Sequence, residues 1–74
     1  MDNIYPLTII ADRYQGTYSG GAYLAFNLNY DEIPPEVSGS DLECAMFWRE
    51  TNLIVGKGST TFFALMDLIL KLNG

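Results

Sequence analysis

The stretch that decides the fold is Leu53–Asn73, LIVGKGSTTFFALMDLILKLN, because its hydrophobic period changes near Gly58. Before that glycine the segment is short and carries β-branched residues, which favours a strand. After it, apolar residues recur at the 3.6-residue period of a helix, for which Ser59 or Thr60 is the expected N-cap. The stretch therefore predicts a strand that turns directly into a helix.

The predicted helix has a wide apolar face and a narrow polar face. Its expected inward face consists of Phe62, Leu65, Met66, Leu68, Ile69 and Leu72. Ala64, Asp67 and Lys71 mark the outward face, where the i, i+4 pair of Asp67 and Lys71 adds about 0.2–0.5 kcal/mol. We expect Phe62, Leu65 and Ile69 to carry the helix into the core.

The rest of the chain alternates apolar and polar residues as strands do. The predicted strands are Ile4–Asp12, Ala22–Leu28, Leu42–Glu50 and Leu53–Lys57. A glycine-rich hairpin connection is expected at 13–21, and a polar loop around Pro34 and Pro35 at 29–40. The order β-β-β-β-α predicts one α+β domain over residues 1–74, with a four-stranded antiparallel sheet and one C-terminal helix on one face. The opposite face is then left to water or to a partner.

Composition excludes several classes of protein. The chain is 49% hydrophobic and 14% aromatic, which is unlike a disordered protein. Without histidine, and with Cys44 as the only cysteine, it lacks the commonest general base, the ligands of a zinc site and the partner for a disulfide. We therefore expect no enzyme activity, cofactor or metal. The segment GKGST lacks the spacing of a phosphate-binding P-loop, and the EF-hand calcium spacing is also absent.

Charge and hydropathy narrow the expected location and ligands. Four basic residues are too few for direct nucleic-acid binding. The N-terminal MDNIYPL lacks the basic start and apolar run of a signal peptide. The longest apolar run is interrupted by Asp67 and Lys71, and it is shorter than the roughly 20 residues that span a bilayer. These features predict a monomeric cytoplasmic protein with no membrane association.

The net charge of −5 is confined to one stretch, Asp31–Glu50, DEIPPEVSGSDLECAMFWRE. Acids and bases balance in the rest of the chain, so the negative field is local and concerns partners. Aromatic residues serve as interface anchors with charges around them. The candidate partner-binding residues are Asp31, Glu32, Glu36, Asp41, Glu43 and Glu50, with Phe47 or Trp48 as the anchor. The alternative is a solvated stretch that keeps an apolar protein in solution.

Several segments resemble the small domain of HicB-type antitoxins: YPLTII, AYLAFNL, IVGKGST and FALMDLILKL. Gly58, Thr60, Ala64 and Leu68 fill the family's G-x-T-x-x-x-A-x-x-x-L turn into a helix. This resemblance implies a domain that binds and neutralises a toxin enzyme.

In size, acidity and a sheet flanked by one helix, the chain also resembles phage-encoded anti-CRISPR proteins, most of all the type I-C inhibitors. This resemblance implies an inhibitor that acts in the host cytoplasm during phage infection and binds the surveillance complex, Cascade. The implied partner is the basic DNA-binding surface of the type I-C Cascade large subunit, near the site that reads the PAM. The acidic stretch would imitate DNA there, so this interpretation competes with the antitoxin interpretation.

Overall fold

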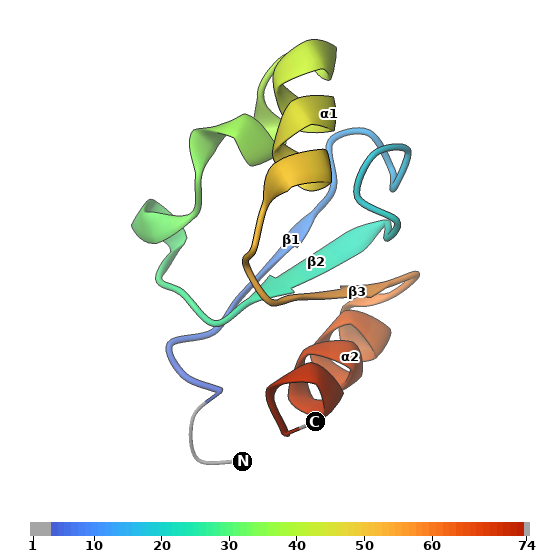
Figure 1. Ribbon diagram of the computed structural model, residues 1–74. Coiled ribbons are helices and arrows are strands. Elements are labelled where there is room, and N and C mark those ends of the chain that lie inside the picture. Colours follow the sequence, from blue (N-terminus) through green and yellow to red (C-terminus); the bar gives the residue numbers. More distant parts are fainter. Residues whose placement is uncertain (1–3, 74) are drawn as a thin grey trace.

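The structure is a computed structural model and describes residues 4–73. The described residues form two α-helices, three strands and two short 3₁₀ turns, η1 and η2 (Figure 1). In chain order the elements are β1 (Thr8–Ala11), β2 (Tyr23–Phe26), η1 (Tyr30–Glu32), η2 (Pro35–Ser38), α1 (Asp41–Glu50), β3 (Val55–Gly58) and α2 (Thr61–Asn73).

The described strands form one antiparallel sheet with β2 in the middle. Ala25 of β2 pairs with Ile9 of β1 on one side and with Gly56 of β3 on the other. Helix α2 covers one face of the sheet, and α1 with the 3₁₀ turns covers the other face (Figure 1). The predicted α+β class is therefore confirmed, but the sheet has three strands in the described residues where four were predicted.

The missing strand is the segment Leu42–Glu50, which was predicted as extended and lies in helix α1. A capping box starts this helix: the Glu43 N–H donates to Ser40 Oγ at 3.3 Å, and the Ser40 N–H donates to Glu43 Oε1 at 3.1 Å. The box satisfies backbone donors that a helix start leaves unpaired. Cys44, Phe47 and Trp48 recur at helical spacing: Cys44 is buried with its thiol donating to the Val37 carbonyl, and Phe47 and Trp48 pack against the core cluster of the sheet. The prediction that this sheet face is open was consequently wrong.

Both faces of the sheet are buried, because the strands alternate apolar side chains toward the two helical layers. On the α1 side the buried cluster is Leu24, Phe26, Val37 and Val55. On the α2 side it is smaller and consists of Ala25, Ala64 and Leu68. The central strand β2 contributes to both clusters, which explains why every residue from Leu24 to Phe26 is buried.

Helix α2 begins where expected, but it presents a different face to the sheet. The Phe63 N–H donates to Thr60 Oγ1 at 3.1 Å, so Thr60 is the N-cap. Ala64 and Leu68 are fully buried, whereas Phe62 is 62% exposed and Met66 is also exposed. Leu65 and Ile69 are half-buried. The predicted roles of Phe62 as a core residue and of Ala64 as an outward residue were therefore wrong.

The face that α2 presents to the sheet is set by β3, because Gly56 and Gly58 of this strand have no side chains to separate it from the helix. A Cβ added at Gly56 would lie 2.6 Å from Leu68 Cβ, and one at Gly58 would lie 2.6 Å from Phe63 Cβ. No real Cβ fits at such distances, so the helix packs directly against the strand backbone. Close packing of this kind selects the small residue Ala64 for the inner face, and the larger aromatic residues turn outward.

This helix face predicts the outcome of two alanine substitutions. Leu68→Ala should lower the free energy of unfolding by about 2–5 kcal/mol, because it removes a fully buried side chain and leaves a cavity. Phe62→Ala should change it by less than about 1 kcal/mol, since that ring is mostly exposed. Urea denaturation of both variants checks the assignment, and the reverse order of effects would contradict it.

Candidate protein-binding surface

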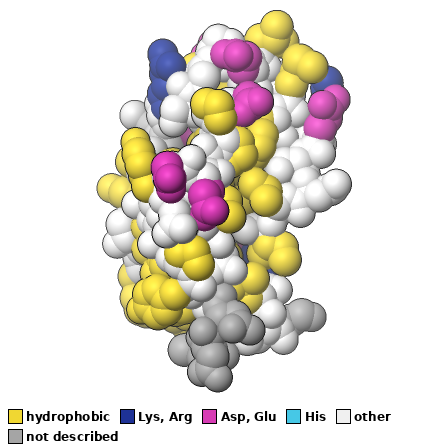
Figure 2. Space-filling model, turned by 90° about the vertical axis from the view of Figure 1, so that its left-hand side faces the viewer, with side chains coloured by type: hydrophobic (Ala, Val, Ile, Leu, Met, Phe, Trp, Pro, Cys, Tyr) yellow, Lys and Arg dark blue, Asp and Glu magenta, His cyan; other side chains and the backbone are white. Residues whose placement is uncertain are grey.

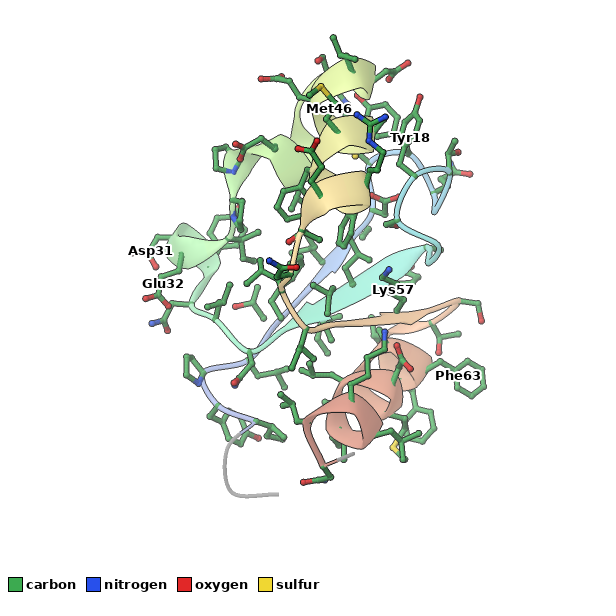
Figure 3. All side chains as sticks on the ribbon, in the orientation of Figure 1. Tyr18, Asp31, Glu32, Met46, Lys57 and Phe63 are labelled. Atoms are coloured by element: carbon green, nitrogen blue, oxygen red, sulfur yellow. The ribbon has the colours of Figure 1, made fainter. Side chains whose placement is uncertain are left out.

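The six acids of the Asp31–Glu50 stretch lie on η1, η2 and α1, which we call the acidic layer. All six side chains are exposed. Figure 2 shows acidic side chains spread over one face of the molecule, with hydrophobic side chains between them. In Figure 3, Asp31 and Glu32 point outward from η1. The structure thus brings the predicted acids into one helical layer on a single side of the sheet.

Local hydrogen bonds hold the layer in place. The Asn29 N–H donates to Glu32 Oε1 at 2.9 Å and caps η1, while Pro35 starts η2. From the connection between β1 and β2, Arg13 Nη1 donates to the Ser38 carbonyl at 3.0 Å, and the Tyr14 hydroxyl donates to the Gly39 carbonyl at 2.6 Å. The layer is therefore fastened to the sheet at the C-terminal end of η2.

Cations compensate little of the layer's charge. The nearest ion pair joins Arg49 and Glu50 at 3.9 Å, with both side chains largely exposed. An exposed pair at this distance contributes little and is screened by salt. Arg13 lies beside the layer, but its guanidinium donates to backbone carbonyls. Within the described part of the chain, the acidic layer consequently presents to solvent a negative field that cations compensate little.

A groove of about 430 Å³ runs between η2 and α1. Met46 and Phe47 provide its apolar lining, and Glu36, Glu43 and Glu50 contribute carboxylates. On α1 the sequence Glu43, Met46, Glu50 follows the i, i+3, i+7 spacing of one helix face, so the two acids stand about 10 Å apart along the axis. The groove is therefore lined by both apolar and acidic side chains.

The two predicted aromatic anchors lie toward the core side of α1. Phe47 and Trp48 are half-buried, contact each other edge to face at 5.0 Å between centroids, and pack against the α1-side core. Lys57 Nζ lies 5.0 Å from the Trp48 ring centroid. Phe47 reaches the groove, and Trp48 lines a separate hollow beside Lys57 and Lys71.

Three further apolar residues of the acidic layer and its flank are exposed, and the sequence did not lead us to predict them. Tyr30, Leu42 and Met46 are all exposed, with Met46 at 42%. The signal that identifies Leu42 and Met46 is the capping box Ser40-x-x-Glu43, because it starts a helix and a helix turns these two residues outward. Interpreted as a strand, the same segment places them on the buried face with Cys44.

Reactive chemistry is not evident in the described residues. Cys44 is fully buried, and burial raises the pKa of its thiol, which disfavours the nucleophilic thiolate. Asp12 is buried in the turn after β1, where its carboxylate accepts hydrogen bonds from the Gly16 N–H and the Ser19 hydroxyl. Between residues 4 and 73, no cluster of three or more His, Cys, Asp or Glu side chains is placed to hold a metal ion.

Asp67 joins α2 to β3. Its carboxylate accepts from the Lys57 N–H at 2.8 Å and lies 2.8 Å from Lys71 Nζ, which also donates to the Val55 carbonyl at 2.9 Å. Burial works to raise the pKa of Asp67, but the hydrogen bonds from Lys71 and Lys57 and their charges outweigh it and hold the pKa below its ordinary value. Burial and the nearby Lys71 lower the pKa of Lys57.

A pH dependence of stability follows from the Asp67 pair. Because the pKa of Asp67 is lower in the folded than in the unfolded state, its carboxylate stabilises the fold above the unfolded value of about 3.9. That contribution is lost as the pH falls through the folded pKa. The stability difference between wild type and Asp67→Asn should therefore shrink as the pH is lowered from about 5 to 2. Urea midpoints measured across this range check it, and a constant difference would contradict it.

The outer face of α2 forms a second unpartnered surface on the side of the sheet opposite to the acidic layer. Its exposed residues are Phe62, Phe63, Met66 and Leu70. Figure 3 shows Phe63 pointing away from the sheet. Neither helix in the described part of the chain has the length and hydropathy needed to cross a bilayer.

The geometry thus defines a small α+β protein with one acidic and one apolar surface and no evident reaction centre among its described residues. Comparison with protein-family models, with curated proteins and with solved structures found no match to this chain.

Proposed function

We propose that this protein is a small acidic inhibitor that binds a basic, DNA-binding surface of another protein and excludes DNA from it. The observation that carries the proposal is the exposure of all six carboxylates of the acidic layer, opposed by Arg49 at 3.9 Å from one of them. A surface that normally holds phosphates is rich in Lys and Arg, and it attracts any comparably dense negative field.

The capping hydrogen bonds of the layer and the spacing of its acids support DNA mimicry over a solubilising role. Glu43 and Glu50 are two turns apart on α1, about 10 Å, which is close to three base-pair steps of duplex DNA along its axis. Glu32 and Glu43 are fixed by capping hydrogen bonds to backbone N–H groups. Carboxylates that are ordered before binding lose less side-chain entropy when a partner engages them.

The partner that we propose is the large subunit of a type I-C Cascade complex, at the surface that reads the PAM. The support is the resemblance in size and acidity to type I-C anti-CRISPR proteins together with the acidic layer. The single flanking helix of that resemblance does not hold, because helices cover both faces of the sheet. In this proposal the protein acts in the cytoplasm of the infected host cell, binds no nucleic acid itself and needs neither cofactor nor metal.

Binding of the protein to purified type I-C Cascade, with and without a bound PAM-containing duplex, tests the proposal. We expect binding to the free complex, loss of binding when the duplex is present, and weaker affinity as salt rises, because exposed charges are screened over about 8–10 Å near physiological ionic strength. Equal binding to free and DNA-loaded Cascade would contradict the proposal.

The second candidate is an antitoxin-like domain that caps a toxin enzyme. Its support is where the HicB-like motif lies in the structure. Thr60 of that motif caps α2, and its Ala64 and Leu68 are fully buried against the sheet. These residues serve the fold, so the support concerns architecture. In this case the apolar outer face of α2 is the natural contact surface. This candidate would be favoured if Phe63→Lys abolished binding to the partner protein and if DNA did not compete with that binding.

A further inference from the structure

The groove between η2 and α1 combines acidic and apolar side chains. Electrostatic attraction of a basic partner requires only the acidic ones. Met46 lines the groove together with three glutamates and is 42% exposed. Glu43 and Glu50 flank Met46 along α1, and Glu36 comes from η2. A purely repulsive or solubilising surface has no need of apolar residues such as Met46 and Phe47 between its acids.

We infer that this groove binds an arginine-bearing amphipathic helix of the partner protein. The inference rests on the proposed function, because it specifies how the acidic layer engages a basic surface. Arginine fits the groove in two ways: its aliphatic stem covers apolar surface, and its planar guanidinium stacks on neighbouring side chains and bonds carboxylates in bidentate fashion. Lysine offers only a point charge to the same site.

The spacing of the groove carboxylates Glu43 and Glu50 defines the bound helix further. Acids at i and i+7 of α1 match cations seven residues apart on a helix that lies along the groove, with an apolar residue between them facing Met46. Glu43 Oε1 already accepts the Ser40 N–H, but a carboxylate has further lone pairs for a guanidinium. Among residues 4–73, Glu50 has only its weak contact with Arg49 to exchange.

The chain offers two methionine methyl groups that report on its two candidate surfaces. Met46 lies in the groove, and Met66 lies on the outer face of α2. The probe is a helical peptide with two arginines seven residues apart and a leucine between them, titrated into full-length protein labelled with ¹³C at its methionine methyls. The matched probe carries citrulline, which keeps the shape of arginine without its charge.

We expect the arginine peptide to shift the Met46 methyl resonance and to leave that of Met66 in place. Citrulline should weaken binding at least about tenfold, because the charge-assisted hydrogen bonds are lost. The double variant Glu36→Gln, Glu50→Gln should weaken the arginine peptide similarly. The control variant Gln15→Lys, Ser59→Lys changes the net charge equally at exposed positions outside the acidic layer and should weaken it by less than about threefold.

Three results would overturn the inference: no shift of Met46, equal binding of both peptides, or a shift of Met66 alone, which would point to the α2 surface. If one of these occurs while the protein still competes with DNA for Cascade, the groove inference is wrong and the proposed function stands. If the arginine peptide binds as expected but DNA does not compete, the groove is a peptide-binding site and the proposed function is wrong.

Discussion

Gly56→Val should leave this protein unfolded, and Gly56→Ala should lower its free energy of unfolding by about 3 kcal/mol or more. A Cβ added at this glycine would lie 2.6 Å from both the Cβ and the backbone nitrogen of Leu68. The atoms in the way belong mainly to the helix backbone, which cannot rotate aside as a side chain can. Circular dichroism and urea denaturation measure the effect.

Gly39→Ala is the matched control. Its new methyl group would meet mainly the side chain of Glu43, with Oε1 at 2.8 Å, and that exposed side chain can move at the cost of its capping hydrogen bond with the Ser40 N–H. The φ angle of Gly39 is −79°, which alanine adopts without strain. We expect a loss of no more than about 1 kcal/mol. Equal losses for Gly39→Ala and Gly56→Ala would contradict the close packing of α2 on β3.

The largest functional effect is expected from neutralising three acids at once. The variant Asp31→Asn, Glu32→Gln, Glu36→Gln keeps side-chain shape, and the amide oxygen that Glu32→Gln introduces can still accept the Asn29 N–H. These exposed carboxylates contribute little to stability, so the fold should be unaffected. Affinity for a basic partner should fall at least about a hundredfold, because three close interfacial charge pairs are removed.

A suitable control must add the same charge elsewhere. Between residues 4 and 73, the acids outside the acidic layer do not serve, because Asp12 is buried and Asp67 is paired with Lys71. The control is therefore Gln15→Lys, Ser59→Lys, Asn73→Lys, which changes net charge equally at exposed positions outside the layer. If net charge alone attracts the partner, both triple variants will lose affinity to the same extent.

The strand and helix of Leu53–Asn73 were predictable because the local signals of that segment agree. The change of period at Gly58 and the hydroxyl of Thr60 fix the start of α2, and both were interpreted correctly. The face of α2 was not predictable from hydrophobicity, because two glycines of β3 make close packing more favourable than burial of Phe62. That preference depends on which strand lies beneath the helix, which a helical period does not encode.

The segment Leu42–Glu50 shows how two periods can coincide. Its apolar residues Leu42, Cys44, Met46 and Trp48 alternate as in a strand, yet Cys44, Phe47 and Trp48 also satisfy a helix. The capping box at Ser40 and Glu43 decides between them. The acidic stretch itself was visible in the sequence, but its groove was not, because the groove depends on how η2 packs beside α1.

The most direct test of the acidic layer as the binding surface is displacement of a labelled PAM-containing duplex from type I-C Cascade, with the wild type and both triple variants titrated in parallel. We expect the wild type and the lysine-added control to displace the duplex at protein concentrations within about tenfold of each other, since charge outside the layer acts only through screened solvent. The neutralised variant should need at least about a hundredfold more protein. Displacement by the neutralised variant at the wild-type concentration would contradict the account.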